Sequence, residues 1–369
     1  MKRSGFRALA LMLGALCATT TTAALAQGEI PFDAVDFLRP PADMHLGEIA
    51  GVAVNAQGHV FVYQRGNTSG PAYGAAASQL LEFDQNGAYV REIGKGLYAW
   101  SYAHAVRVDP RGNIWAMDKG SDMVIKFTPA GRVAMVFGRK PEASDENAHP
   151  LEHPNPPRAP VDGQFRQVTD IAWDSKGNGY ISDGYINSRV AKVGPDGQWL
   201  KSWGSFGSEP GQFNTLHSIA SDANDRIYVA DRGNRRIQVF DTEGKLLDIL
   251  TINVPAPPNA PAAIGNRPKI NPDGTAAPGN GTMQPGAPWA ICITPKGPNG
   301  QFLYVADAYP GRVYKLTLDG KVLGWLGGSG KQLKQFGWIH EIACPSENTL
   351  FVGELLNWRL QKLTLRPGK

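Results

Sequence analysis

The sequence has 369 residues and a formal net charge of +4, from 37 Lys and Arg residues against 33 Asp and Glu residues. This charge is small and scattered along the chain, which argues against a nucleic-acid partner. The 43 glycines and 28 prolines favour many turns between short strands over long helices. No segment after the N-terminal leader is long and apolar enough to predict a membrane span.

The N-terminus has the pattern of a signal peptide. Basic residues precede the apolar run Ala8–Ala18, which is too short to cross a bilayer, and an A-x-A cleavage site ends at Ala26. Residues 1–26 are therefore expected to be removed, leaving a periplasmic or secreted protein. Lipoprotein processing at Cys17 is less favoured, because Leu16 replaces the small residue that such a site needs.

Six repeats follow one another along the mature chain. Each has an apolar strand, a D/N-x-x-G/N turn, a second strand that often ends in Asp, and a third strand that often starts with Arg-Val or Arg-Ile. The repeats are Gly51–Gly94, His104–Gly138, Val168–Gly204, His217–Phe240, Pro288–Gly327 and His340–Leu365. In the fourth, Arg226–Ala230 and Arg236–Phe240 are predicted strands, and Leu246–Leu250 completes a four-stranded blade. The pattern resembles the NHL-repeat family and predicts an all-β, six-bladed β-propeller over residues 49–369.

The ends of the ring and three insertions depart from this pattern. The last repeat stops after its third strand, and an open sheet edge would invite aggregation. The segment 27–48 is expected to supply the missing strand around Val35–Leu38 and so to close the ring. Insertions at Gly66–Ser78 and at about 139–166 and 251–287 are typical of loops that are functional or disordered.

Two cysteines remain once the leader is removed, Cys292 and Cys344. Each lies in an apolar, strand-like run. Two buried thiols are favoured over a disulfide, which the sequence does not exclude.

Three of the seven histidines hold one repeat position, the start of the innermost strand, in alternate blades. They are His104, His217 and His340, whereas the other blades have Ala50, Thr169 and Trp289 there. Pseudo-symmetry would place the three imidazoles in a triangle around the central axis. Three neutral imidazoles with an open fourth position are what a catalytic Zn²⁺ needs. The alternative for each residue is a hydrogen-bonded structural histidine, but the other four histidines all fall at different repeat positions.

The ends of the second strands open on the same face as these histidines. Arg65, Tyr185 and Arg232 lie there. A guanidinium suits an anionic substrate group, and a tyrosine near a metal and an arginine can act as a base. The structural alternatives are packing between blades for Arg232 and a buried aromatic for Tyr185. The packing alternative is weaker for Arg65, because blade one departs from the repeat pattern there. Carboxylates that recur at this position are interpreted as structural turn residues: Asp118, Asp183, Asp231 and Asp307.

Ordered motifs across almost the whole mature chain resemble peptidyl-α-hydroxyglycine α-amidating lyase. They are GVAVNAQGHVFVYQRG, HAVRVDPRGNIWAMD, ISDGYINSRV, PGQFNTLHSIA, VADRGNRRIQVF and FGWIHEIA. The resemblance implies zinc ligands at the three histidines named above. It also implies a catalytic role for Tyr185 and Arg65, a substrate-binding role for Arg232, and a pocket wall at Trp338.

The same resemblance implies a structural Ca²⁺ held by the backbone carbonyls of Val52 and Val106 and the carboxylate of Glu341. The sequence departs from the family here, because Glu341 stands where the family has Asp. Trp338 and Ile339 also replace a Met-Pro pair near the zinc, and the chain has no copper monooxygenase domain to make the hydroxylated substrate.

The expected function is a zinc-dependent lyase that splits a carbinolamide into an amide and glyoxylate. The expected partner is a small molecule or a peptide C-terminus, bound by a monomer. Two alternatives remain at this point. One is a non-catalytic periplasmic NHL propeller that binds or scaffolds a partner, and the other is a propeller metal hydrolase or lyase acting on a different small substrate.

Overall fold

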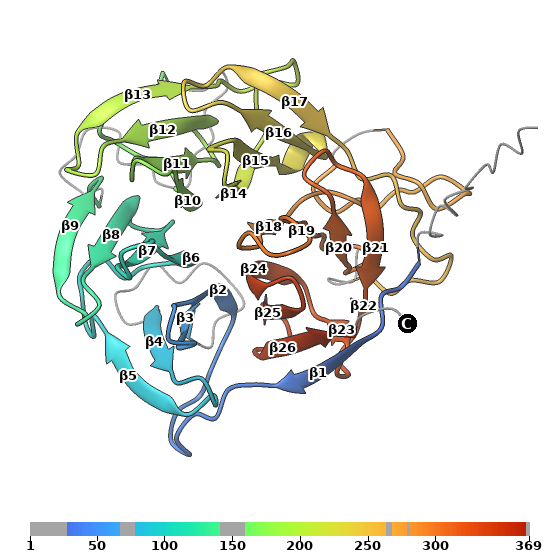
Figure 1. Cartoon of the computed structure of the whole chain (residues 1–369), viewed down its shortest axis with the longest axis horizontal. Helices are drawn as coiled ribbons and strands as arrows, with labels where there is room; N and C mark the ends of the chain where they lie inside the picture. Colours follow the sequence, from blue (N-terminus) through green and yellow to red (C-terminus); the bar gives the residue numbers. More distant parts are fainter. Residues whose placement is uncertain (1–27, 67–77, 141–158, 263–267, 279–280, 367–369) are drawn as a thin grey trace, which may run out of the picture.

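The computed structural model describes residues 28–66, 78–140, 159–262, 268–278 and 281–366. In these ranges the chain forms short strands and one 3-10 turn, and no α-helix. Six four-stranded antiparallel sheets are arranged around a common axis (Figure 1). The predicted all-β, six-bladed β-propeller is therefore confirmed. No helix of the described part is long and apolar enough to cross a membrane.

Each blade runs outward from the axis in sequence order. Blades one to three are β2 (Ile49–Val54), β3 (Val60–Gln64), β4 (Gln79–Phe83) and β5 (Tyr89–Ile93); β6 (Ala103–Val108), β7 (Ile114–Asp118), β8 (Met123–Phe127) and β9 (Val133–Phe137); and β10 (Asp170–Trp173), β11 (Gly179–Asp183), β12 (Arg189–Val193) and β13 (Trp199–Trp203). Blades four and five are β14 (Leu216–Ser221), β15 (Ile227–Asp231), β16 (Arg236–Phe240) and β17 (Leu246–Leu250); and β18 (Ala290–Ile293), β19 (Leu303–Ala306), β20 (Val313–Leu316) and β21 (Val322–Leu326). The 3-10 turn η1 (Arg232–Asn234) follows β15.

Blade six contains β24 (Ile339–Ser346), β25 (Thr349–Glu354) and β26 (Leu360–Leu365), and its outer strand is β1 (Phe32–Asp36) from the N-terminal segment. Between blades five and six, β22 (Gly328–Ser329) and β23 (Gln335–Phe336) form a short parallel pair. The closing strand begins three residues before the expected Val35–Leu38. The reason is that Phe32 is buried in the blade-six core, whereas Phe37 packs against Phe351 at the junction with blade one.

Side-chain hydrogen bonds explain why the D/N-x-x-G/N turns recur. In blade two, Asp109 Oδ1 accepts hydrogen bonds from the backbone N–H groups of Arg111 and Asn113. Gly112 closes the turn with a φ of 81°, which glycine adopts without steric cost. The turn joins the innermost strand of the blade, β6, to the second strand, β7. It thereby sets the register in which the start of β6 lies beside the end of β7.

Cys292 on β18 and Cys344 on β24 form a disulfide, with their Cα atoms 6.1 Å apart. The expectation of two free buried thiols was therefore wrong. The two residues are 52 positions apart, but they lie on neighbouring innermost strands of blades five and six. Sequence spacing alone does not show which positions of adjacent blades face each other.

The described parts of the insertion at 251–287 pack onto the ring. Ala256 contacts the buried ring of Tyr309, and Arg312 Nη1 donates to the carbonyl of Pro255 at 2.9 Å. The predicted signal peptide, most of the insertion at Gly66–Ser78 and residues 141–158 of the insertion at 139–166 lie outside the described residues.

Candidate metal centre

His104, His217 and His340 meet on the propeller axis. They lie near the starts of β6, β14 and β24, the innermost strands of alternate blades, and all three are buried. Their ring centroids are 4.7, 4.7 and 4.8 Å apart, a nearly equilateral triangle. One nitrogen from each ring lies within 4.8 Å of the others. The structure thus brings together the three histidines that the repeat position singled out.

A backbone carbonyl of the next blade fixes each imidazole. The Nδ1 atoms of His104, His217 and His340 lie 2.8, 2.6 and 2.7 Å from carbonyl oxygens. These carbonyls belong to Thr169, Trp289 and Ala50, the residues predicted to hold the equivalent positions in blades three, five and one. A carbonyl only accepts hydrogen bonds, so each Nδ1 carries the proton and each Nε2 presents a lone pair.

The donor set fits a metal ion held by three neutral imidazoles. Burial is the largest cause that lowers the pKa of each histidine well below 6.5, so the rings stay neutral. His217 Nε2 is buried and has no hydrogen-bond partner among the described residues. A buried acceptor without a partner is costly, and a metal ion would satisfy it. The carbonyls that hold the Nδ1 atoms match the outer contacts usual for metal-bound histidine.

Tyr185, in the loop after β11, packs against two of the three histidines. Its hydroxyl is 3.4 Å from His104 Nε2, and its ring packs edge-on against His104 and His217. Burial alone would raise the pKa of the phenol. The positive charges of Arg232 and Lys119 outweigh burial and lower the pKa below its ordinary value of 10.

Arg65 is held beside the metal site by polar contacts of its guanidinium. Its Nε donates to the carbonyl of Ala103 at 2.8 Å, and its Nη1 pairs with Glu48 Oε2 at 3.0 Å. Its Nη2 is 3.2 Å from His340 Nε2. Arg65 and Glu48 are both buried, so the carboxylate compensates the charge of the arginine and sets its direction.

Arg232 offers a buried cation without a compensating carboxylate among its described contacts. Its guanidinium lies 3.9 Å from the centre of the Trp289 ring and 5.4 Å from that of Tyr185. Its Nε and Nη1 atoms have no hydrogen-bond partner in the described part of the chain. Leaving such donors buried is unfavourable, so this position favours an anionic ligand. Trp338 completes the wall, because its ring meets Trp289 at 5.0 Å and an interplanar angle of 81°.

Sequence reasoning missed Lys119, the third cation of this face. Its Nζ lies 4.2 Å from the centre of the Tyr185 ring and 5.1 Å from that of Tyr102. The signal was present, because Lys119 follows Asp118 at the repeat position that Arg65 and Arg232 hold in blades one and four. Glu48, Tyr102 and the side chain of Trp289 were also not predicted.

The recurring carboxylates at the second-strand ends hold backbone rather than facing the site. Asp118 accepts hydrogen bonds from the N–H groups of Ser101, Tyr102 and Ser121. Asp307 likewise accepts from the N–H groups of Gly286, Gly311 and Arg312. Their interpretation as structural residues is confirmed.

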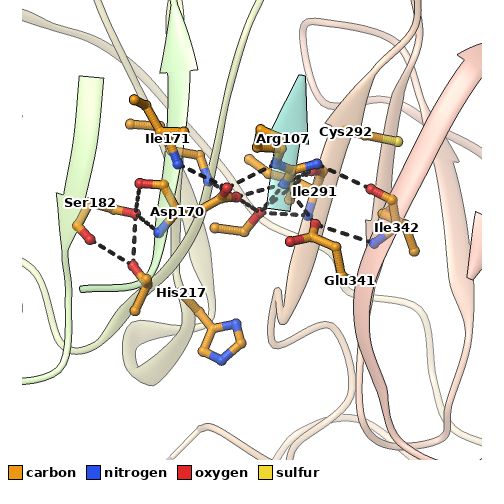
Figure 2. A network of polar contacts seen from close by, with 12 residues as sticks. Arg107, Asp170, Ile171, Ser182, His217, Ile291, Cys292, Glu341 and Ile342 are labelled. Carbon is orange, nitrogen blue, oxygen red and sulfur yellow. Dashed lines mark hydrogen bonds and ion pairs between the residues drawn. The ribbon is translucent and has the colours of Figure 1, made fainter. Parts of the chain in front are cut away.

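The residues expected to hold calcium lie close together, but their carboxylate is already paired. Val52 and Val106 lie on adjacent innermost strands, and a Cβ at Gly51 would come within 2.7 Å of Val106 N. Glu341 Oε1 lies 2.7 Å from Nη2 of Arg107 (Figure 2). A cationic side chain at this place does not fit a calcium ion on the same carboxylate.

Comparisons with known proteins agree with this architecture. The family model of the NHL repeat matches residues 213–240, which contain the three inner strands of blade four, β14, β15 and β16. The chain carries an NHL repeat, as the sequence predicted. The mouse NHL repeat-containing protein 3 is 32% identical over 206 residues, which cover 52% of this chain and 51% of that protein.

The expected resemblance to amidating lyases is also confirmed. The peptidylglycine alpha-amidating monooxygenase of Rattus norvegicus is 30% identical over 222 residues, covering 54% of this chain and 21% of the relative. A probable peptidyl-alpha-hydroxyglycine alpha-amidating lyase of Caenorhabditis elegans is 26% identical over 213 residues, covering 53% of this chain and 56% of the relative. The match thus spans about a fifth of the rat protein and about half of the nematode one.

Solved structures share the fold. A gluconolactonase of Xanthomonas campestris superposes with a TM-score of 0.56 at 14% identity, over 94% of both chains. A streptogramin B lyase superposes with a TM-score of 0.53 at 15% identity, over 91% of this chain and 98% of the other. At these identities the likeness concerns the propeller alone.

Proposed function

We propose that this protein is a zinc-dependent lyase that cleaves carbinolamides of the peptidyl-α-hydroxyglycine type into an amide and glyoxylate. The observation that carries the proposal is the placement of Tyr185. Its hydroxyl lies 3.4 Å from an Nε2 atom of the three-histidine cluster, and cations lower its pKa. The sequence similarity to amidating lyases supports the same reaction class.

Zinc would be held by the Nε2 atoms of His104, His217 and His340 and, when bound, would supply a Lewis acid for the substrate hydroxyl. Arg65 would add a second positive contact at the same oxygen. It is pre-oriented for this by Glu48 and the carbonyl of Ala103, so little reorganisation is needed as negative charge develops.

Tyr185 would move the proton of the reaction. As a phenolate it takes the proton of the substrate hydroxyl, and the oxygen forms the C=O bond of the aldehyde. The electrons of the C–N bond leave with the nitrogen, which receives a proton from the phenol as the amide departs. No water is consumed, and Tyr185 returns to its starting state.

Arg232 and Lys119 would hold the carboxylate of the substrate. The Nε and Nη1 donors of Arg232 have no partner among the described residues and would each donate to an oxygen of the bound substrate. Lys119 lies 4.2 Å from the centre of the Tyr185 ring and adds positive charge without a fixed direction. Trp289 and Trp338 would pack against the acyl part of the substrate. A small molecule or a peptide C-terminus fits this arrangement.

A non-catalytic scaffold accounts less well for these groups. A scaffold gains nothing from burying a bare imidazole nitrogen at His217 and bare donors at Arg232, and each costs free energy when no ligand satisfies it. Action on a different small anionic substrate would use the same residues, and the choice of substrate in the assay distinguishes it. We further propose export to the periplasm or the medium, and a monomeric state.

The test is release of glyoxylate from an N-acyl-α-hydroxyglycine by zinc-loaded protein. We expect turnover by the wild type and a loss of at least about 100-fold in Tyr185→Phe with zinc content unchanged. Tyr309→Phe is the matched control, because Tyr309 occupies the same repeat position in blade five but packs against Ala256 away from the histidines. Full activity of Tyr185→Phe would remove the tyrosine from the mechanism, and no turnover by the wild type would refute this substrate class.

A further inference from the structure

Arg107 lies on the innermost strand of blade two, three residues after His104. Arg107 on β6 makes a two-pronged ion pair with Asp170, through Nε to Oδ1 at 2.8 Å and Nη2 to Oδ2 at 2.6 Å. The same Nη2 lies 2.7 Å from Glu341 Oε1. Figure 2 shows the guanidinium between these two carboxylates, with the side chain of His217 pointing away from them.

Further polar contacts tie Arg107 to most of the ring. Nη1 lies 3.3 Å from the carbonyl of Ile342, and Nη2 lies 3.3 Å from Ser218 Oγ and 3.4 Å from the carbonyl of Ile291. With Asp170 on β10, these partners belong to the innermost strands of blades three, four, five and six. A single side chain from blade two therefore connects five of the six blades.

The same set of oxygens would be suitable for a hard divalent cation if the arginine were absent. It contains two buried carboxylates, two backbone carbonyls and one hydroxyl, which are ligands of the kind that calcium takes. In the structure, nitrogen atoms of Arg107 already occupy hydrogen-bonding positions on both carboxylates. A calcium ion there would have to displace the guanidinium and would be repelled by its charge.

We propose that Arg107 is a built-in cation that takes the place of a structural calcium ion at the centre of this propeller. The ion pairs of Arg107 then hold the innermost strands together, and the stability of the folded propeller does not depend on the calcium concentration of the solution. The inference concerns the ring and is independent of the proposed reaction at the histidines.

The first test is made on the wild type. After dialysis into calcium-free buffer with zinc kept constant, we expect elemental analysis to find no retained calcium, and the Tm to change by less than about 1 °C when about 1 mM Ca²⁺ is added. About one calcium ion retained per chain, or a clear rise in Tm with calcium, would overturn the proposal. This test needs no variant to fold.

The second test uses Arg107→Ser, which frees both carboxylates. Arg107 lines a cavity of about 310 Å³ at the far ends of the innermost strands, which gives ions a route to the vacated place. We expect the variant to bind Tb³⁺ with luminescence sensitised by tryptophan, and Ca²⁺ to raise its Tm by at least about 5 °C. Arg111→Ser, which removes an exposed arginine from the same blade, should behave like the wild type.

The outcomes are decisive in both directions. A variant that folds only with Ca²⁺ supports the exchange of one cation for another. A folded Arg107→Ser protein that shows no Tb³⁺ luminescence and no change in Tm with Ca²⁺ contradicts the proposal. If the variant folds in neither buffer, the calcium content and Tm of the wild type decide. Because neither readout is an enzymatic rate, failure of the lyase assay would leave this result standing.

Discussion

At the scale of single residues, the candidate site depends on which atom of each side chain carries the proton. The carbonyls behind His104, His217 and His340 require a proton on Nδ1, so each Nε2 atom keeps a lone pair that can bind a metal ion. Tyr185 shows the opposite balance, because nearby cations favour its charged form. Neutral ligands and an acidic phenol next to one another suit a metal-assisted proton transfer.

Removal of Lys119 should change the pH dependence of the reaction. Without this positive charge the phenolate of Tyr185 is less stable, so the phenol pKa rises toward 10. In Lys119→Met we expect the ascending limb of kcat/KM against pH to move to higher pH. Arg232→Met should move it further, because Arg232 is the larger of the two charge effects.

Lys126→Met is the control for this experiment. Lys126 lies on β8 of the same blade over the ring of Trp115, away from the histidines. We expect its pH profile to match that of the wild type. An unshifted profile in Lys119→Met would mean that Lys119 has no electrostatic role at Tyr185.

The repeat position predicted most of these residues but not all of them. The histidines, Arg65, Tyr185 and Arg232 could be found because symmetry converts equal repeat positions into equal places around the axis. Lys119 shared the arginine position and was overlooked, whereas Glu48 lies before the first repeat strand, where no repeat pattern applies. Arg107 has no counterpart in the other blades, so no pattern could single it out.

At the scale of strands and turns, the closing strand is the least local element. β1 pairs with β26, from Phe32 opposite Leu365 to Asp36 opposite Gln361. Its existence was predictable because blade six lacks an outer strand. Its register was not predictable, because a shift of the pairing by two residues in either direction would keep the same side chains facing the core. The burial of Phe32 in the blade-six core decides the register.

Phe32→Ala should destabilise the protein through this strand. Phe32 is 4% exposed in the core of blade six, so removal of the ring leaves a cavity at the seam of the propeller. We expect a loss of about 3 kcal/mol in the free energy of unfolding, measured by urea denaturation. Val35→Ala lies on the same strand but is 52% exposed and should cost less than about 1 kcal/mol. Equal effects of the two changes would show that β1 does not close the ring.

A turn carboxylate should make stability depend on pH. Asp122, between β7 and β8, accepts a hydrogen bond from Gln167 N, and burial raises its pKa from 3.8 to about 7. The folded state therefore keeps this proton while the unfolded chain loses it above pH 3.8. The contribution to stability is complete below pH 3.8 and is lost as the pH rises toward 7.

Asp122→Asn should remove this dependence, since the amide oxygen can still accept from Gln167 N. We expect the stability of the variant relative to the wild type to rise between pH 4 and pH 7 by up to about 4 kcal/mol. Urea denaturation at both pH values measures it, with the exposed Asp43→Asn as control. A relative stability that does not change with pH would show that Asp122 ionises normally.

At the scale of the whole molecule, the fold follows from repetition and the site follows from the meeting of distant blades. Six repeats predict six blades, because each repeat contains a similar succession of strands and turns. The disulfide of Cys292 with Cys344 and the ion pairs of Arg107 join blades through residues that have no counterpart in the other repeats, so they could not be predicted. The repeats therefore predict the blades, whereas these contacts near the propeller axis are visible only in the structure.

The most direct test of the account is a crystal of the zinc-loaded protein measured on both sides of the zinc absorption edge. We predict one anomalous peak on the propeller axis, about 2.0–2.1 Å from the Nε2 atoms of His104, His217 and His340. The peak should disappear in His217→Ala. Zinc at any other place, or no zinc bound by the wild type, would contradict the central claim that these three imidazoles form a metal site.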